Sequence, residues 1–123
     1  MKKTVMIVDD SPLIHMLLTK ALIKTGYEVC ADAKNGKEAV ELYRQLAPDL
    51  IFMDINMPIM DGLEASSQIF ETAKQTGRTV RIIMLSAVGD DEIVKKAGAL
   101  GIKTFLNKPF DDYKIISAVS RVD

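Results

Sequence analysis

Residues 50–62 read LIFMDINMPIMDG: four apolar residues in succession, then an aspartate and a turn that contains a proline and a glycine. An apolar run without alternation predicts a strand covered on both faces, which is typical of a parallel sheet between two layers of helices. Residues 5–8 and 82–85 are apolar runs of the same kind, and polar residues follow each of them. The three runs therefore predict the central strands of a parallel sheet.

Stretches with helical periodicity separate the apolar runs. In residues 11–24 apolar side chains recur every three or four positions, and Ser11 followed by Pro12 predicts a helix start with a capping hydroxyl. The predicted strands are 5–8, 29–31, 50–53, 80–85 and 104–106, and the predicted helices are 11–24, 36–46, 63–75, 90–99 and 111–122. This alternation predicts an α/β fold of the (βα)5 type, a doubly wound, flavodoxin-like parallel sheet of five strands with helices on both faces. We expect residues 1–123 to form a single domain.

The composition argues against several classes of protein. With 17 acidic and 16 basic residues the formal net charge is -1, so the chain lacks the dense positive field with which many nucleic-acid-binding proteins neutralise phosphates. Its apolar runs fall far short of the roughly 20 residues that span a bilayer. The single cysteine, Cys30, cannot form a disulfide within the chain, and no long apolar signal sequence is present. We therefore expect a cytoplasmic protein that binds neither nucleic acid nor membrane.

Polar residues gather where the predicted strands end. Asp9 and Asp10 follow the first strand, Asp54 the third, Ser86 the fourth and Lys108 the fifth. The carboxyl ends of parallel strands meet at one edge of the sheet, where ligands bind. Two carboxylates about 4 Å apart repel each other by ~4 kcal/mol at an effective dielectric of about 20, and one lysine cannot neutralise three of them. The pattern predicts a bound divalent cation, and Mg2+ is the natural candidate because it prefers oxygen ligands.

The same groups suit phosphoryl transfer. A divalent cation and an ammonium group neutralise phosphoryl oxygens, a hydroxyl donates a hydrogen bond, and a carboxylate can act as the nucleophile. Asp54 is the predicted nucleophile because it ends the central strand, with the acidic pair on one side and Ser86 and Lys108 on the other.

Four motifs follow one another along the chain: VDDS at 8–11, MDINMPIMDG at 53–62, MLSA at 84–87 and FLNKPF at 105–110. Together they resemble the receiver domains of two-component response regulators, most closely the stand-alone chemotaxis kind, and the resemblance covers the whole chain. It implies a signalling switch, rather than a turnover enzyme, that accepts a phosphoryl group from a histidine kinase phosphohistidine. It also implies that the face of the fourth helix, fifth strand and fifth helix controls an output partner, and that a monomer can dimerise on phosphorylation.

The resemblance assigns roles to the acidic residues. Asp54 resembles the aspartate that accepts the phosphoryl group and becomes an acyl phosphate. Asp10 and Asp54 resemble the direct Mg2+ ligands, together with the backbone carbonyl of Asn56, while Asp9 would act mainly through water.

The resemblance also assigns a lysine and two switch residues. Lys108 resembles the lysine that pairs with Asp54 and then with its phosphate, and the Lys108–Pro109 bond would be cis. Ser86 resembles the switch hydroxyl that moves onto the phosphate, and Phe105 the aromatic residue that turns inward behind it. Two departures stand out: Ser86 replaces the more common threonine, and Phe105 replaces the tyrosine of the chemotaxis proteins.

Other functions fit parts of the pattern. One alternative is a receiver domain from a longer multidomain regulator. The sequence identifies neither the kinase nor the output partner. An aspartate-nucleophile phosphatase of the haloacid dehalogenase type needs a second aspartate two positions after the nucleophile, where this chain has Asn56. A flavodoxin-type carrier needs a first loop that cradles a phosphate dianion, which Asp9 and Asp10 would repel. The switch is therefore the favoured prediction.

Overall fold

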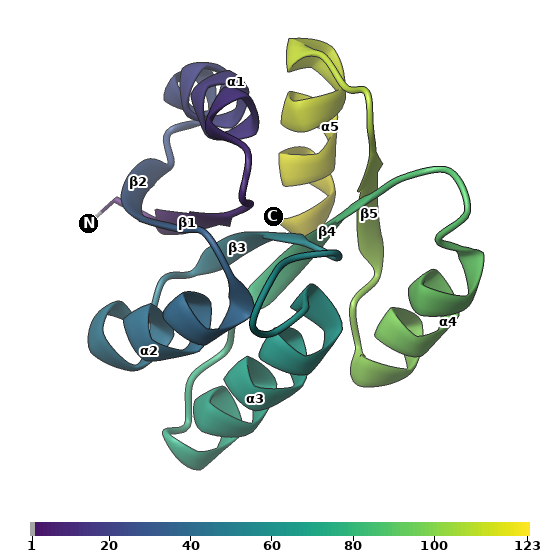
Figure 1. Ribbon diagram of the computed structural model, residues 1–123. Helices are drawn as coiled ribbons and strands as arrows, with labels where there is room; N and C mark the ends of the chain where they lie inside the picture. Colours follow the sequence, from purple (N-terminus) through teal and green to yellow (C-terminus); the bar gives the residue numbers. More distant parts are fainter. Residues whose placement is uncertain (1) are drawn as a thin grey trace.

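Five parallel strands form the sheet at the centre of the molecule (Figure 1). The computed structural model describes residues 2–123. The strands are β1 (Thr4–Val8), β2 (Glu28–Ala33), β3 (Leu50–Asp54), β4 (Arg81–Ser86) and β5 (Thr104–Asn107), and their order in the sheet is β2-β1-β3-β4-β5. The order reverses direction at β1, so the switch point of the topology lies between β1 and β3. The predicted doubly wound α/β fold is confirmed.

Helices cover both faces of the sheet. They are α1 (Pro12–Leu22), α2 (Gly36–Leu46), α3 (Gly62–Gln75), α4 (Asp91–Leu100) and α5 (Asp112–Val122), with a short 3-10 turn, η1 (Ile23–Thr25), after α1. Helices α1 and α5 pack on one face, and α2, α3 and α4 on the other (Figure 1). The two layers explain why the central strands are apolar at successive positions.

The two faces of β3 show how an apolar run serves both layers. Leu50 and Phe52 point into the core under α1 and α5, whereas Ile51 and Met53 point into the core under α2, α3 and α4. All four side chains are fully buried. A polar residue in this run would bury a polar group in one of the two cores, where water cannot hydrogen-bond to it. Only a continuous apolar stretch therefore fits the central strand.

Most element ends lie within one residue of the prediction, and the larger differences are at the first helix and the second strand. The first helix is regular only to Leu22, and the predicted residues 23 and 24 belong to the 3-10 turn that leads to Gly26, whose φ is 84°. The second strand is longer than predicted because its pairing with β1 runs from Glu28 to Ala33. The predicted capping hydroxyl of Ser11 is wrong, because its side chain makes no capping hydrogen bond. The backbone N–H of Ser11 donates to Asp9 Oδ1 at 2.8 Å.

Three other helices have side-chain caps. Asn35 accepts from the N–H of Glu38 at the start of α2, Asp61 caps α3 and Asp111 caps α5 in the same way. Within residues 2–123, no helix has both the length and the apolar character that crossing a membrane requires.

Candidate functional site

Asp9, Asp10 and Asp54 lie together at the carboxyl edge of the sheet. β1 and β3 pair with Val8 opposite Met53, so Asp9 and Asp54, which follow these residues, come side by side. One carboxylate oxygen from each of the three aspartates lies within 4.8 Å of the others. Asp9 and Asp54 are only 1% and 6% exposed, while Asp10 is open to solvent. The structure thus concentrates three acidic groups in a site that water reaches from one side.

Lys108 reaches this acidic cluster from the segment after β5. Its Nζ lies 3.0 Å from Asp54 Oδ1 and 3.2 Å from Asp9 Oδ2. Its backbone N–H donates to the carbonyl of Ser86 at 2.8 Å, which fixes the residue beside the end of β4. The Lys108–Pro109 bond is cis, as the resemblance implies. Among the described residues, Lys108 is the one cation that forms ion pairs with the cluster, so negative charge remains in excess.

Burial dominates the titration of Asp54. Removal from water disfavours the carboxylate and raises the pKa of Asp54; the hydrogen bond from Lys108 lowers it in part, and the charge of Asp9 raises it further. Burial alone would lower the pKa of Lys108, but the hydrogen bond and charge of Asp54, together with Asp9, outweigh burial and raise it. Ionising Asp54 therefore costs folding free energy as long as no further cation faces it.

A pH dependence of stability follows from the raised pKa of Asp54. Between the ordinary pKa of about 3.9 and the raised value, the folded chain holds a proton that the unfolded chain has lost, so stability falls as pH rises through this window. The variant Asp54→Asn lacks this loss. We expect its free energy of unfolding minus that of the wild type to grow as pH rises above 4 and then to level off. Urea unfolding in EDTA measures this difference, and a difference independent of pH would contradict the assignment.

Ser86 ends β4 directly opposite Asn107, which ends β5. The Oγ of Ser86 donates to Asn107 Oδ1 at 2.6 Å. Ser86 is only 3% exposed, so this hydrogen bond satisfies a hydroxyl that water barely reaches. The sequence analysis did not single out Asn107; the available signal was a polar residue that closes a strand and immediately precedes Lys108.

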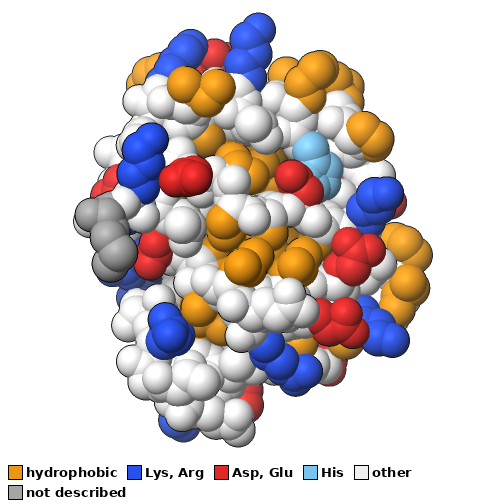
Figure 2. Space-filling model, turned by 90° about the vertical axis from the view of Figure 1, so that its left-hand side faces the viewer, with side chains coloured by type: hydrophobic (Ala, Val, Ile, Leu, Met, Phe, Trp, Pro, Cys, Tyr) orange, Lys and Arg blue, Asp and Glu red, His pale blue; other side chains and the backbone are white. Residues whose placement is uncertain are grey.

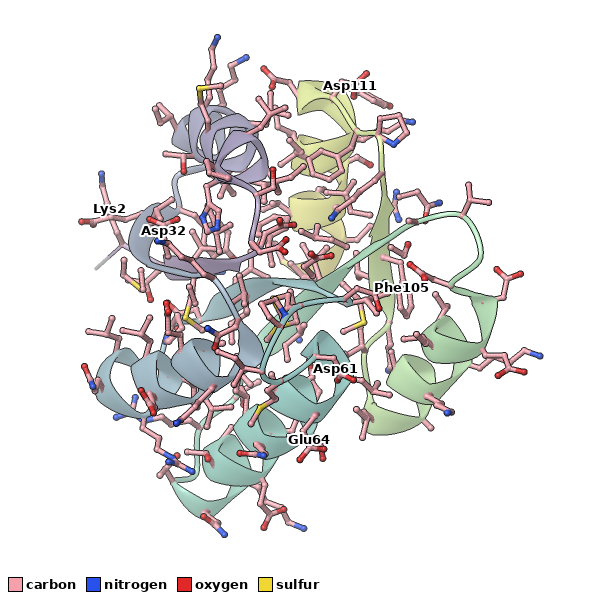
Figure 3. The ribbon with its side chains drawn as sticks, in the orientation of Figure 1. Lys2, Asp32, Asp61, Glu64, Phe105 and Asp111 are labelled. Carbon is pink, nitrogen blue, oxygen red and sulfur yellow. The ribbon has the colours of Figure 1, made fainter. Side chains whose placement is uncertain are left out.

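Phe105 lies on β5 (Figure 3). In the sheet its register partner on β4 is Met84. It is partly buried and packs against the core on the face covered by α2, α3 and α4. The structure therefore places the predicted switch aromatic two residues before Asn107, on the side of β5 that faces this helix layer.

The loop between β3 and α3 folds tightly against the end of β3. The N–H of Ile55 donates to Asp54 Oδ1 at 2.9 Å, and the N–H of Gly62 donates to the carbonyl of Ile55 at 2.8 Å. A Cβ at Gly62 would lie 1.9 Å from the carbonyl oxygen of Asp54, so only glycine permits this approach. Asn56 is exposed in this loop, two residues after Asp54.

His15 is a second residue that the sequence analysis gave no role at the site. Its Nε2 lies 2.6 Å from the carbonyl oxygen of Asp9, and its Nδ1 lies 2.6 Å from Asp32 Oδ1. Both partners are acceptors, so the ring donates to both only when both nitrogens carry a proton. His15 thereby ties the segment after β1 to the end of β2.

A hollow of about 640 Å3 opens beside the acidic cluster, between α1 and the end of β2. Figure 2 shows this side of the molecule, where apolar side chains gather near the histidine. Pro12, Met16 and Ile23 contribute apolar lining, and Asp9 and Asp10 also line the hollow. The acidic cluster therefore borders a hollow whose lining combines apolar and charged side chains.

Comparison with protein families gives one match over most of the chain. Residues 5–120 match the response regulator receiver domain. The chemotaxis protein CheY of Bacillus subtilis is 41% identical over 121 residues, which cover 98% of each chain. CheY of Thermotoga maritima is 40% identical over 122 residues, which cover 99% of this chain and 98% of the relative.

Solved structures show the same relationship. CheY in the CheX–CheY–BeF3–Mg2+ complex of Borrelia burgdorferi superimposes with a TM-score of 0.88 at 37% identity, over 98% of this chain and 88% of the other. The chemotaxis response regulator CheY4 of Vibrio cholerae has a TM-score of 0.87 at 29% identity, and both chains are covered completely.

Proposed function

Because the chain belongs to the family of response regulator receiver domains, we propose that it is a phosphorylation-activated switch in which Asp54 accepts the phosphoryl group. The family is one of signalling domains rather than classical enzymes. One observation carries the proposal: the buried Asp54 carboxylate lies 3.0 Å from Lys108 Nζ, with the oxygens of Asp9 and Asp10 within 4.8 Å. The Asp54 carboxylate can thus act as a nucleophile beside the ammonium group of Lys108, and the neighbouring carboxylate oxygens can ligate a metal cation.

The proposed step transfers a phosphoryl group from a phosphohistidine of a histidine kinase. A carboxylate oxygen of Asp54 bonds to phosphorus, the phosphorus–nitrogen bond breaks, and its electron pair stays on the imidazole nitrogen. The product is an acyl phosphate on Asp54. Lys108 already pairs with the carboxylate, so its ammonium group is in place to neutralise charge on the incoming phosphoryl oxygens.

The acidic cluster fits Mg2+. Receiver domains of this type bind the ion in an acidic pocket, and three carboxylates facing one lysine have the donors and the excess charge that a hard divalent cation needs. Asp10, Asp54 and the carbonyl of Asn56 would hold the ion directly, with Asp9 acting mainly through water. When bound, the ion would neutralise oxygen charges of the phosphoryl group.

The switch would work through Ser86 and Phe105. The Ser86 hydroxyl would move onto the phosphate of Asp54, and Phe105 would turn inward behind it, which changes the face formed by α4, β5 and α5. Phe105 packs against the core but is only partly buried, so its ring can turn inward from a partly exposed position. A local change in charge would thus shift the packing of a surface that an output partner reads.

The setting of this switch follows from the same proposal. The phosphodonor is a histidine kinase, the location is the cytoplasm, and the output is a separate protein or a further domain of a longer regulator. The chain would be a monomer that can dimerise on phosphorylation. The phosphatase alternative gains no support, because the position two residues after Asp54 holds Asn56 and not a second acid.

Acetyl phosphate with Mg2+ tests the proposal. We expect the intact mass to rise by one phosphoryl group per chain, and we expect EDTA to prevent the rise because the carboxylates then repel the donor. Steady phosphate release from a small phosphomonoester, through a phosphoaspartate on Asp54 that does not accumulate, would instead favour the phosphatase.

A further inference from the structure

We infer that Asn107 is a positioning residue: it holds the Ser86 hydroxyl in the unphosphorylated state and competes with the phosphoryl group for the hydroxyl proton. The inference rests on the proposed function and adds to it a residue that opposes activation. Two features carry it, the short hydrogen bond between the two side chains and the place of Asn107 next to Lys108.

The geometry of the pair is fixed by the sheet. Ser86 and Asn107 are register partners at the ends of β4 and β5, and the next backbone hydrogen bond, from Lys108 N–H to the carbonyl of Ser86, extends the pairing at 2.8 Å. The Ser86 Oγ donates to Asn107 Oδ1 at 2.6 Å, which is short even for a hydroxyl donor. The backbone pairing therefore keeps Ser86 and Asn107 side by side, with the amide oxygen of Asn107 within reach of the Ser86 hydroxyl.

A serine hydroxyl has a single proton to donate. In the present structure Asn107 Oδ1 accepts it. A Ser86 hydroxyl that donates to a phosphoryl oxygen on Asp54 must first release Asn107. The switch movement therefore breaks one hydrogen bond as it makes another, and the bond to Asn107 weights the balance toward the unphosphorylated state.

Asn107 also lies next to the residue that senses the phosphoacceptor. Lys108 pairs with Asp54 and Asp9, and it follows Asn107 directly in the chain. A shift of Lys108 toward a phosphoryl group would displace the peptide bond between Asn107 and Lys108, and with it the side-chain amide of Asn107. Through this peptide, loading of Asp54 and release of Ser86 would be coupled.

Asn107→Ala removes the acceptor while Asn107 itself is exposed, so the fold should tolerate the change. The buried Ser86 hydroxyl then loses its partner in the unphosphorylated state only. We expect beryllofluoride, a phosphoryl mimic, to bind about 5-fold more tightly, which corresponds to one net hydrogen bond. Isothermal titration calorimetry at fixed Mg2+ measures the dissociation constant. Asn107→Val, which also lacks the acceptor and favours a strand, should give the same gain and serves if the alanine variant is unstable.

A double-mutant cycle separates this role from a general effect on β5. In the Ser86→Ala background, the change Asn107→Ala should leave the beryllofluoride dissociation constant unchanged, because no hydroxyl remains to be held. Lys103→Ala, an exposed change just before β5, should also leave it unchanged.

Three outcomes would overturn the inference. Unchanged or weaker binding by Asn107→Ala, with normal binding by the wild type, removes Asn107 from the switch and leaves the proposed function intact. An equal gain in the Ser86→Ala background shows that Asn107 acts without Ser86. A wild-type chain that takes up neither beryllofluoride nor phosphate from acetyl phosphate overturns the proposed function and the inference together.

Discussion

The variant Asp54→Asn is expected to lose all phosphorylation by acetyl phosphate. Asparagine keeps the shape of the side chain, but its amide cannot form the acyl phosphate that a carboxylate oxygen forms. The acidic neighbours Asp9 and Asp10 remain, so the experiment asks whether one carboxylate among three is the acceptor. Intact mass after reaction with acetyl phosphate and Mg2+ should match that of the unmodified variant, while the wild type gains one phosphoryl group.

A matched control removes a carboxylate elsewhere. Asp91 is exposed in the first turn of α4, and Asp91→Asn should be phosphorylated like the wild type. The same urea experiment that measures pH dependence shows whether Asp54→Asn is folded. A folded Asp54→Asn chain that still gains a phosphoryl group would assign the acceptor to another residue and refute the assignment of Asp54.

The variant Gly62→Ala is expected to destabilise the protein by about 3 kcal/mol. A Cβ at this position would lie 1.9 Å from the carbonyl oxygen of Asp54 and 3.0 Å from Met53 Cγ. The first contact is with backbone, which no rotamer change relieves, so β3 or the start of α3 must shift. A loss of this size is a large share of the 5–15 kcal/mol that typically stabilises a domain. Urea unfolding measures the loss, and phosphorylation of the folded fraction should slow because the end of β3 has moved.

Gly98→Ala is the matched control for this prediction. Gly98 is also helical, within α4, but a Cβ there would meet nothing within 4 Å. The same substitution should therefore stabilise the protein by about 1 kcal/mol, because alanine favours a helix over glycine. Effects of the same sign at both positions would show that the contact with Asp54 does not govern the outcome.

Much of the fold could be predicted because its signals are local. The apolar run in residues 50–53 predicts a strand buried on both faces, and the structure places its side chains alternately in the two cores. Helix ends were predicted less well, because they depend on contacts outside the helix. At Ser11 the expected cap is absent: its side chain accepts no hydrogen bond from the first turn of α1.

The site could be predicted in part for the same reason. Any polar residue directly after a parallel strand lies at the carboxyl edge, so the positions of Asp9, Asp54 and Lys108 follow from the order of the elements. Asn107 and the contacts of His15 were missed because they depend on pairs of residues. Neither residue type is unusual at its position, and only the register of β4 with β5, or the packing of α1 on the sheet, shows what each one contacts.

The sequence by itself determined the parallel α/β architecture and the edge at which the acidic residues meet, because periodicity and strand ends are properties of the chain alone. Only the tertiary structure decided how those groups interact. Burial raises the pKa of Asp54. The Nζ of Lys108 lies 3.0 Å from Asp54 Oδ1, and the Ser86 hydroxyl donates to Asn107 Oδ1. These facts depend on distance and on exclusion of water, which arise when strands far apart in sequence pack side by side.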